Sequence, residues 1–203
     1  DPEGGNPRSA WEEICADGKE SQLAWRQSGR YVARLTQVRE EERRLVVSRE
    51  GRLSVQRDRT YLITGGLGAL GIRVAQWLAE LGAQHLVLCG RRGLGSDEVR
   101  QSIVHIEGQG VQVRVVQADV SVEADVRQVI SLIKEGMPPL SGIIHAAGVL
   151  EDGVLQHQTW ERFAKVLSPK VAGAWNLHVA THGQRLDFFV CFSSAVAIMG
   201  AAG

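Results

Sequence analysis

The sequence contains few cysteines, and their placement excludes the usual structural uses of this residue. Three occur among 203 residues, namely Cys15, Cys89 and Cys191, which is an odd number at wide spacing. They do not form the paired pattern typical of a disulfide framework or a zinc site. The sequence therefore predicts free thiols in a reducing compartment and no metal centre.

A long hydrophobic run and an excess of one charge are also absent. No apolar stretch approaches the ~20 residues that a membrane-spanning helix needs, and the first residues carry no signal-peptide pattern. The 23 basic residues balance 23 acidic ones, so no net field attracts nucleic acid or an anionic membrane. These absences predict a soluble cytoplasmic protein whose partners are neither nucleic acid nor membrane.

The most informative stretch is a glycine-rich segment between an apolar run and a helical pattern. Residues 61–63 end a buried strand, and residues 72–81 repeat apolar side chains at helical spacing. Between them, Gly66, Gly68 and Gly71 have the Gly-x-Gly-x-x-Gly spacing, which permits a tight turn and close approach of a pyrophosphate. Free N–H groups and the helix dipole favour an anion there. A purely structural turn is the alternative, but the strand and helix on either side favour dinucleotide binding.

Strand and helix patterns alternate from residue 60 onward, which is typical of a parallel sheet covered on both faces. Further strands are expected at 86–89, 111–116, 142–147 and 186–192. Helices are expected at 96–107, 121–135 and 160–180, with Ser121 as a cap and a bend or restart at Pro169. The predicted fold class is α/β, a Rossmann-like doubly wound parallel sheet with helices on both faces.

The first 58 residues cannot bury a core alone. Ser9 has the capping-box spacing and predicts the start of a short helix. Two strands are expected at 22–25 and 31–38, with a turn between them. The charged residues 39–44 are interpreted as a solvated linker, and a partner contact is the alternative. Either residues 1–58 pack on residues 59–203, or they are the tail of a domain whose beginning is absent.

The segment after the second strand of the glycine-rich half bears on the choice of cofactor. An NAD-preferring site places an acidic residue about 20 residues past the glycines, where it binds the ribose 2′-hydroxyl. Here Arg91 and Arg92 take that place, and the next acid is Asp97. Guanidinium groups suit a 2′-phosphate. The sequence therefore favours NADPH, with two exposed loop arginines as the alternative.

Two further strand ends carry candidate cofactor contacts. Asp119 could accept a hydrogen bond from an adenine amino group, or it could belong to a helix N-terminus ahead of Ser121. Ala146, Ala147 and Gly148 present no bulky side chain, so a flat ring could pass close to the backbone. A small-residue turn made for packing would look the same.

Six motifs together resemble the ketoreductase domain of modular polyketide synthases, a branch of the short-chain dehydrogenase/reductase superfamily. They follow one another over 59–203: TGGLGALG at 64–71, GRRG at 90–93, ADV at 118–120, HAAGVL at 145–150, PKVAGAWNL at 169–177 and FSS at 192–194. Residues 1–58 resemble the last part of that domain's truncated structural subdomain. The resemblance thus implies a structural part at 1–58 and a catalytic, NADPH-binding part at 59–203.

The resemblance also implies a mechanism and roles for individual residues. In the family, NADPH delivers a hydride to a β-ketone, a tyrosine donates the proton, a serine orients the carbonyl, and a lysine lowers the tyrosine pKa. By motif, Ser194 matches the serine and Lys170 the lysine, although a strand-end serine is otherwise an ordinary cap and a helical lysine an ordinary surface residue. The implied cofactor-binding residues are Thr64, Gly65, Gly66, Leu67, Gly68, Leu70, Gly71, Arg91, Arg92, Asp119, Val120, Ala146, Ala147 and Gly148.

One departure from the family pattern concerns the proton donor. The family's tyrosine and a following asparagine would fall at positions 207 and 211, beyond Gly203. The chain is therefore expected to be a fragment that lacks its own proton donor.

Two places bear on stereochemistry. The family's B-type group, which makes the D-configured (3R) alcohol, carries Leu-Asp-Asp after the Ala-Ala-Gly turn, and Leu150-Glu151-Asp152 is similar to it. The A-type group usually has a tryptophan five residues after the serine, where this chain has Met199. The resemblance therefore implies a B-type reductase, and a solvated acidic turn is the alternative for Glu151 and Asp152.

The leading interpretation is an NADPH-dependent β-ketoacyl reductase domain inside a larger polyketide synthase, with an acyl carrier protein and the other synthase domains as partners. A stand-alone short-chain reductase of the β-ketoacyl type is the alternative enzyme. Residues 1–58 argue against it, because its glycine turn usually comes near the start of the chain, and an asparagine usually stands in place of Lys170. The alternative from another class is a structural or NADPH-binding fragment that does not turn over.

Overall fold

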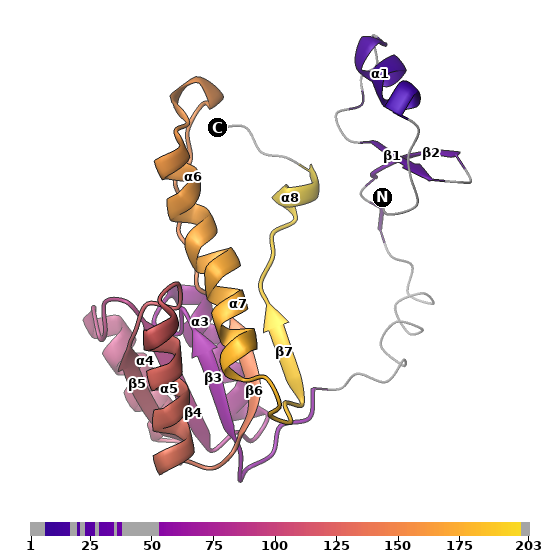
Figure 1. The fold of residues 1–203 in the computed structure, drawn as a ribbon. Helices are drawn as coiled ribbons and strands as arrows, with labels where there is room; N and C mark the ends of the chain where they lie inside the picture. The colour runs from indigo at the N-terminus through magenta and orange to yellow at the C-terminus, as the bar shows by residue number, and fades with distance from the viewer. Residues whose placement is uncertain are drawn as a thin grey trace. The chain divides into compact units, whose positions relative to one another are not determined.

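The structure, a computed structural model, describes residues 7–16, 20, 23–26, 29–34, 36–37 and 53–199. The chain divides into two compact units, one of Asp1–Gly51 with Ser193–Ala202 and a larger one of Arg52–Phe192 (Figure 1). We describe each unit by itself. The boundary predicted near residue 58 stays a prediction.

The smaller unit contains a helix and a two-stranded antiparallel hairpin. Helix α1 spans Pro7–Cys15, and strands β1 (Leu23–Arg26) and β2 (Gly29–Val32) pair with Leu23 opposite Val32. The prediction that the helix starts at Ser9 is wrong, because the helix begins at Pro7, whose fixed φ and missing N–H suit the first helical position. The short helix α8 (Val196–Met199) belongs to the same unit.

The second strand of the hairpin is shorter than the sequence pattern predicts. The pattern covers 31–38, but β2 ends at Val32, opposite the first residue of its partner β1. A strand of an isolated hairpin continues only as far as the other strand offers backbone groups to pair with. The linker predicted at 39–44 lies outside the described residues.

The larger unit is built on a five-stranded parallel sheet of order β5-β4-β3-β6-β7. Its strands are β3 (Thr60–Thr64), β4 (His85–Gly90), β5 (Gln112–Gln117), β6 (Leu140–His145) and β7 (Phe188–Cys191). All five residues of β3 and all six of β6 are buried, as expected for central strands with both faces covered. The predicted fold class, a doubly wound Rossmann-like sheet, is confirmed.

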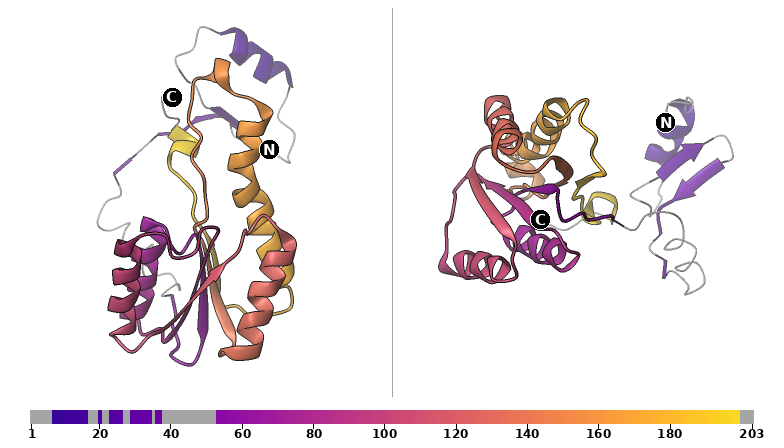
Figure 2. Two further views of the ribbon diagram at one scale, coloured as in Figure 1. Left: turned by 90° about the vertical axis from the view of Figure 1, so that its left-hand side faces the viewer. Right: turned by 90° about the horizontal axis from the view of Figure 1, so that it is seen from below.

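Helices cover both faces of this sheet (Figure 2). The described helices are α3 (Ala69–Glu80), α4 (Asp97–Glu107), α5 (Glu123–Gly136), α6 (Trp160–Leu167) and α7 (Gly173–Ala180), with a 3-10 turn η1 at Leu155–His157. Side chains alternate along β3, so Tyr61 and Ile63 pack against α3 and α4, whereas Leu62 packs against α5 and α7. The strand period of two thus divides the core into two layers.

The beginning of α5 differs from the prediction. The sequence predicts Ser121 as its cap, but the residue before its first turn is Val122, which makes no side-chain capping bond. The Ser121 hydroxyl instead donates to Oδ1 of Asp119 at 2.6 Å. The acidic residues Glu123 and Asp125 occupy the first turn, where a negative charge is stabilised by the helix dipole.

The helix predicted over 160–180 is interrupted at Pro169, as the sequence indicates. Between α6 and α7 the chain forms a π-helical turn, η2 (Ser168–Ala172), in which the N–H of Gly173 donates to the carbonyl of Ser168. Proline has no N–H and its ring crowds the preceding turn, so it interrupts the α-helical hydrogen-bond ladder. The π-helix is rare and occurs mostly as a single turn of this kind within an α-helix.

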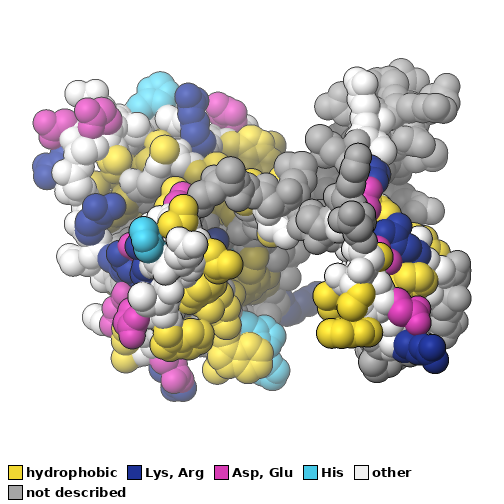
Figure 3. Space-filling view, turned by 90° about the horizontal axis from the view of Figure 1, so that it is seen from above, with side chains coloured by type: hydrophobic (Ala, Val, Ile, Leu, Met, Phe, Trp, Pro, Cys, Tyr) yellow, Lys and Arg dark blue, Asp and Glu magenta, His cyan; other side chains and the backbone are white. Residues whose placement is uncertain are grey.

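The helical segment from α6 to α7 buries one side and exposes large apolar residues on the other. Gly173 and Leu177 are buried, whereas Trp160 and Trp175 are 73% and 65% exposed. Seen from above, hydrophobic side chains gather on the surface of the larger unit (Figure 3). The aromatic residues of this segment therefore contribute little to the described core.

Packing between β6 and β7 requires a glycine at position 142. The ring of Phe188 lies over Gly142, so a Cβ atom there would sit 2.2 Å from the ring atom Cζ. The same ring stacks on Tyr61, with 5.6 Å between the centroids. The Phe188 ring therefore occupies the space that a side chain at position 142 would need.

We expect Gly142→Ala to lower the free energy of unfolding by about 1–3 kcal/mol, the usual cost of overpacking a core. Urea denaturation would measure it. The control is Gly95→Ala, since a Cβ atom at Gly95 meets nothing within 4 Å. Equal midpoints for the two variants would show that Phe188 moves away without cost.

Candidate active site

The candidate site lies at the carboxyl ends of the strands, where the chain order of the sheet reverses. From β3 the chain continues to β4 on one side, and β6 pairs with β3 on the other. Ligands of open α/β sheets bind at such a switch point. A cavity of about 630 Å³ opens there, within the size range of small-molecule and cofactor sites.

The glycine turn forms the floor of this cavity through close backbone contacts. Gly65 has a φ of +66°, and a Cβ atom on it would lie 2.6 Å from the carbonyl oxygen of Ala146. A Cβ atom on Gly71 would lie 2.3 Å from the carbonyl oxygen of Gly65. Helix α3 begins directly after Gly68, which offers no side-chain cap. The first N–H groups of α3 are therefore left for an anion.

The structure brings most of the predicted cofactor-binding residues to this one cavity. Those that line it are Gly65, Leu67, Gly68, Arg91, Arg92, Asp119, Val120, Ala146, Ala147 and Gly148. Thr64, Gly66 and Gly71 are buried behind the lining, and Leu70 is 54% exposed on the first turn of α3. These four residues could contribute to a cofactor site by shaping the glycine turn.

The two predicted arginines both line the cavity. Arg91 and Arg92 are exposed at the cavity mouth. The side-chain amide of Gln117 donates to the carbonyl oxygen of Arg91 at 3.0 Å. This contact ties the arginine loop to the end of β5 and leaves the guanidinium of Arg91 available to the cavity.

Asp119 takes part in the turn before α5, and its contact with an adenine amino group stays a prediction. Its Oδ1 accepts hydrogen bonds from the N–H and the hydroxyl of Ser121, at 2.9 and 2.6 Å. Burial acts to raise the pKa of Asp119, but the Ser121 hydrogen bonds and the charge of Arg91 together lower it. The carboxylate is thus charged, with one oxygen engaged in the turn before α5.

The thiol of Cys89 also lines the cavity, but it is not poised to react. Its Sγ–H donates to the carbonyl oxygen of Ala118 at 3.7 Å. Burial raises the pKa of Cys89 to about 12, with smaller contributions from Asp125 and Asp119. The thiolate needed for nucleophilic chemistry is therefore disfavoured.

Lys170 lies on the π-helical turn beside the cavity. Its side chain is exposed, and Pro169 before it lines the cavity. The Cε atom of Lys170 lies 3.9 Å from the position of a Cβ atom on Gly148. The lysine thus passes close to the small-residue turn after β6.

Ser194 and Met199 lie in the smaller unit. The Oγ atom of Ser194 accepts from the N–H of Val196 at 3.4 Å, ahead of α8. Met199 ends α8, and its side chain lies outside the described part of the chain. A shared site of Ser194 with Lys170 stays a prediction, as does a role for Met199.

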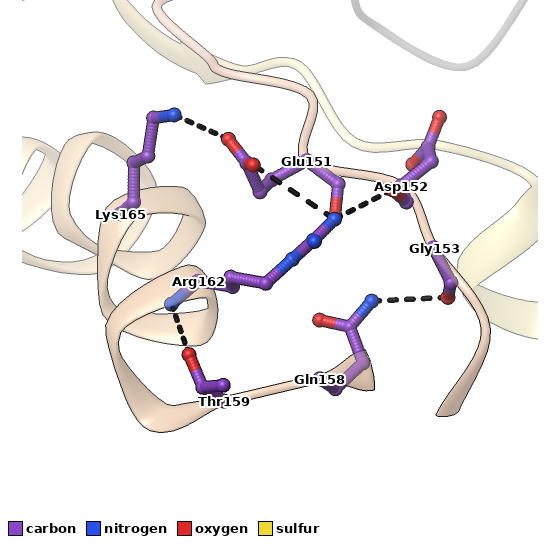
Figure 4. A network of polar contacts seen from close by, with 7 residues as sticks. All are labelled: Glu151, Asp152, Gly153, Gln158, Thr159, Arg162 and Lys165. Atoms are coloured by element: carbon purple, nitrogen blue, oxygen red, sulfur yellow. Dashed lines mark hydrogen bonds and ion pairs between the residues drawn. The ribbon is translucent and has the colours of Figure 1, made fainter. Parts of the chain in front are cut away.

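The loop after β6 is fixed to α6 by a polar network (Figure 4). Glu151 forms an ion pair with Lys165 and a longer one with Arg162, at 3.8 Å. Arg162 also donates to the carbonyl oxygen of Asp152 at 2.7 Å, and Gln158 donates to that of Gly153 at 3.0 Å. The hydrogen bond from Lys165 is the main cause that lowers the pKa of Glu151.

Glu151 and Asp152 consequently differ in what they can do. The carboxylate of Glu151 is held by two cations of α6. In Figure 4 the carboxylate of Asp152 points away from Arg162, and only its backbone takes part in the network. Of the two residues, Asp152 is exposed and Glu151 is half-buried.

Several lining residues are not among those that sequence reasoning selects. They include Gly90, Gly93, Gly95, Ser96, Val99, Ala118, Val149 and Pro169. Most lie in the same strand-end loops as the predicted residues, so loop membership is the signal that would find them. Sequence reasoning also assigns no role to His145, although this residue stands inside one of the six motifs.

The described residues contain no group of three or more histidine, cysteine, aspartate or glutamate side chains that could hold a metal ion. Within the same part of the chain, no helix is both long and apolar enough to cross a membrane.

Comparison with known proteins places this geometry in a family. A family model described as the KR domain matches residues 59–203. The chain is 40% identical over 159 residues to a highly reducing polyketide synthase, PKS6, of Gibberella zeae, covering 78% of this chain and 6% of that protein. It is also 40% identical over 185 residues to a 6-methylsalicylic acid synthase of Arthrobotrys oligospora, covering 85% of this chain and 10% of that protein.

Solved structures agree with this assignment. An N-terminal ketoreductase from the macrolactin assembly line is 39% identical with a TM-score of 0.69, over 74% of this chain and 31% of that one. An A-type ketoreductase from a modular polyketide synthase is 32% identical with a TM-score of 0.77, over 99% of this chain and 42% of that one. The chain thus spans less than half of each of these proteins. It belongs to the KR domain family, the ketoreductase domains of polyketide synthases within the nicotinamide-dependent short-chain dehydrogenase/reductase superfamily.

Proposed function

We propose that this chain is the cofactor-binding part of a reductase that uses NADPH to convert the β-keto group of a carrier-bound polyketide intermediate into a β-hydroxyl. The observation that carries the proposal is the shared cavity at the switch point of the sheet. The glycine turn, the arginine pair and the small-residue turn after β6 all line it, and Lys170 lies beside it.

The residues of the cavity fit NADPH. In the glycine turn, a Cβ atom on Gly65, Gly66 or Gly71 would collide with backbone atoms. The N-terminus of α3, which follows this turn, suits a diphosphate. Arg91 and Arg92 supply the cations for a 2′-phosphate, and Ala146 to Gly148 leave room for a flat ring. When bound, NADPH supplies the hydride that reduces the ketone carbon.

The family resemblance assigns the remaining steps to residues of the protein. Lys170 would lower the pKa of the proton donor by its positive charge, and Ser194 would donate a hydrogen bond that orients the substrate carbonyl and stabilises the forming alkoxide. The resemblance assigns donation of the proton to a tyrosine that follows the serine in the family's pattern.

We further propose B-type stereochemistry, giving the D-configured (3R) alcohol. The support is the Leu-Glu-Asp sequence after the small-residue turn and Met199 in place of a tryptophan. The network in Figure 4 supports a part for Glu151 in this proposal. Held by Lys165 and Arg162, it fixes the loop on α6 and leaves Asp152 to meet the substrate.

The partners and location follow from the same proposal. The substrate is a β-ketoacyl thioester presented by an acyl carrier protein, and the other domains of the same synthase adjoin the reductase. The enzyme acts in the cytoplasm.

We expect replacement of both Arg91 and Arg92 by alanine to raise KM for NADPH about tenfold or more, because charge-assisted hydrogen bonds to the 2′-phosphate are lost. KM for NADH should change less than about threefold, since NADH carries no 2′-phosphate. The measurement is NADPH and NADH oxidation with a β-ketoacyl thioester by the full-length protein. Arg100→Ala is the matched control, since Arg100 is an exposed arginine of α4 outside the cavity lining. An equal loss for both cofactors would contradict the assignment of these arginines.

We expect Glu151→Gln and Lys165→Met each to lower the ratio of D to L alcohol roughly two- to fivefold, the range for loss of one partly exposed ion pair. Both variants remove the ion pair between Glu151 and Lys165, so their effects should not add fully in the double variant. Chiral chromatography of the product gives the ratio. Glu107→Gln, at the end of α4, is the control for removal of one carboxylate. An unchanged ratio in both test variants would remove the loop from stereocontrol.

A further inference from the structure

A buried histidine connects three separate elements of the larger unit beneath the cavity. The Nδ1 atom of His145, at the end of β6, lies 2.6 Å from Oγ1 of Thr64 at the end of β3. Its Nε2 atom lies 2.9 Å from the carbonyl oxygen of Pro169 in the π-helical turn. His145 is 4% exposed and Thr64 is fully buried. Both ring nitrogens are thus occupied by protein groups.

The two partners fix the protonation state of the ring. A carbonyl oxygen only accepts, so Nε2 must carry the proton that is donated to Pro169. Nδ1 is then the acceptor for the hydroxyl of Thr64. Burial lowers the pKa of His145, which favours this neutral form. The ring therefore has one tautomer and one orientation.

The approach of the π-helical turn to this ring depends on a glycine. A Cβ atom on Gly173 would lie 2.8 Å from Cγ2 of Val120 and 3.3 Å from Cε1 of His145. Any larger residue would lift the start of α7 away from the sheet. Gly173 thus lets the carbonyl of Pro169 come within hydrogen-bond distance of His145.

The carbonyl that His145 holds belongs to the peptide unit leading into Lys170. Because a peptide unit is planar, fixing the oxygen of Pro169 also fixes the N and Cα atoms of Lys170. The lysine side chain leaves from that Cα and passes beside Gly148, three residues after His145. One imidazole therefore ties the lysine backbone to the strand whose end forms the small-residue turn.

We infer that His145, oriented by Thr64, is a positioning residue for Lys170: it sets the direction in which the ammonium group extends along the cavity. The inference rests on the catalytic role proposed above for Lys170. It differs from a role in folding alone, because it locates the effect of His145 in one other side chain.

The test is a double-mutant cycle in the full-length protein, with kcat for reduction of a β-ketoacyl thioester as the readout. We expect His145→Leu to lower kcat by about tenfold or more in the presence of Lys170. In a Lys170→Met background the same change should cost less than about twofold, because the group that it positions is absent. Thr181→Val is the control, since it removes another buried hydroxyl, bonded to Leu177, away from the cavity.

Two polar variants keep the test decisive if the leucine variant unfolds. The longer amide of His145→Gln can both donate and accept, and it reaches Pro169, so it should recover most of kcat. The shorter amide of His145→Asn can meet Thr64 but not Pro169, so it should resemble the leucine variant. Urea midpoints of all variants separate loss of fold from loss of rate.

The outcomes distinguish failure of the positioning role of His145 from failure of the catalytic role proposed for Lys170. Equal losses for the His145 variants with and without Lys170 would overturn the positioning role and leave Lys170 catalytic. Equal kcat for the glutamine and asparagine variants would overturn it as well. Wild-type kcat in Lys170→Met alone would instead overturn the catalytic role of Lys170, and the positioning role with it.

Discussion

The larger unit depends on backbone atoms meeting backbone atoms at the switch point of the sheet. The turn after β3 contacts the turn after β6. The contact is so close that a Cβ atom on Gly65 would lie 2.6 Å from the carbonyl oxygen of Ala146. This approach closes the floor of the cavity, and α3 begins directly after it. The same backbone atoms of these two turns therefore line the cavity and hold the sheet together. A substitution that moves them would alter both the cavity and the packing.

The sequence predicts most of this fold because its signals are local. Buried strands and the glycine spacing identify β3 and α3, and alternation identifies the remaining parallel strands. The wrong predictions concern the ends of helices and strands, where different end points differ little in free energy. Ser9 has a capping-box partner, yet Pro7 suits a first turn better, and Ser121 bonds to Asp119 instead of capping α5. Such competition between nearby polar groups cannot be ranked from spacing alone.

The site is less predictable, because its decisive contacts join distant parts of the chain. The sequence around Thr64 and His145 does not predict that the hydroxyl of one and the imidazole of the other, 81 residues apart, form a hydrogen bond. The sequence does not predict the ion pair between Glu151 and Lys165 either, because an acidic turn and a charged helix each have the pattern of solvated surface. Sequence reasoning locates the loops through strand ends and motifs. The division of work within a loop, such as that between Glu151 and Asp152, emerges only from three-dimensional contacts.

The π-helical turn sets the rotational phase of α7. An α-helix turns by about 100° for each residue, whereas η2 closes its hydrogen bond five residues apart, from Gly173 back to Ser168. Relative to a continuous α-helix, α7 is therefore displaced in phase from α6. Leu177 faces the sheet and Trp175 faces outward in that phase. Winding the same residues as an unbroken α-helix would turn Leu177 away from its position in the core.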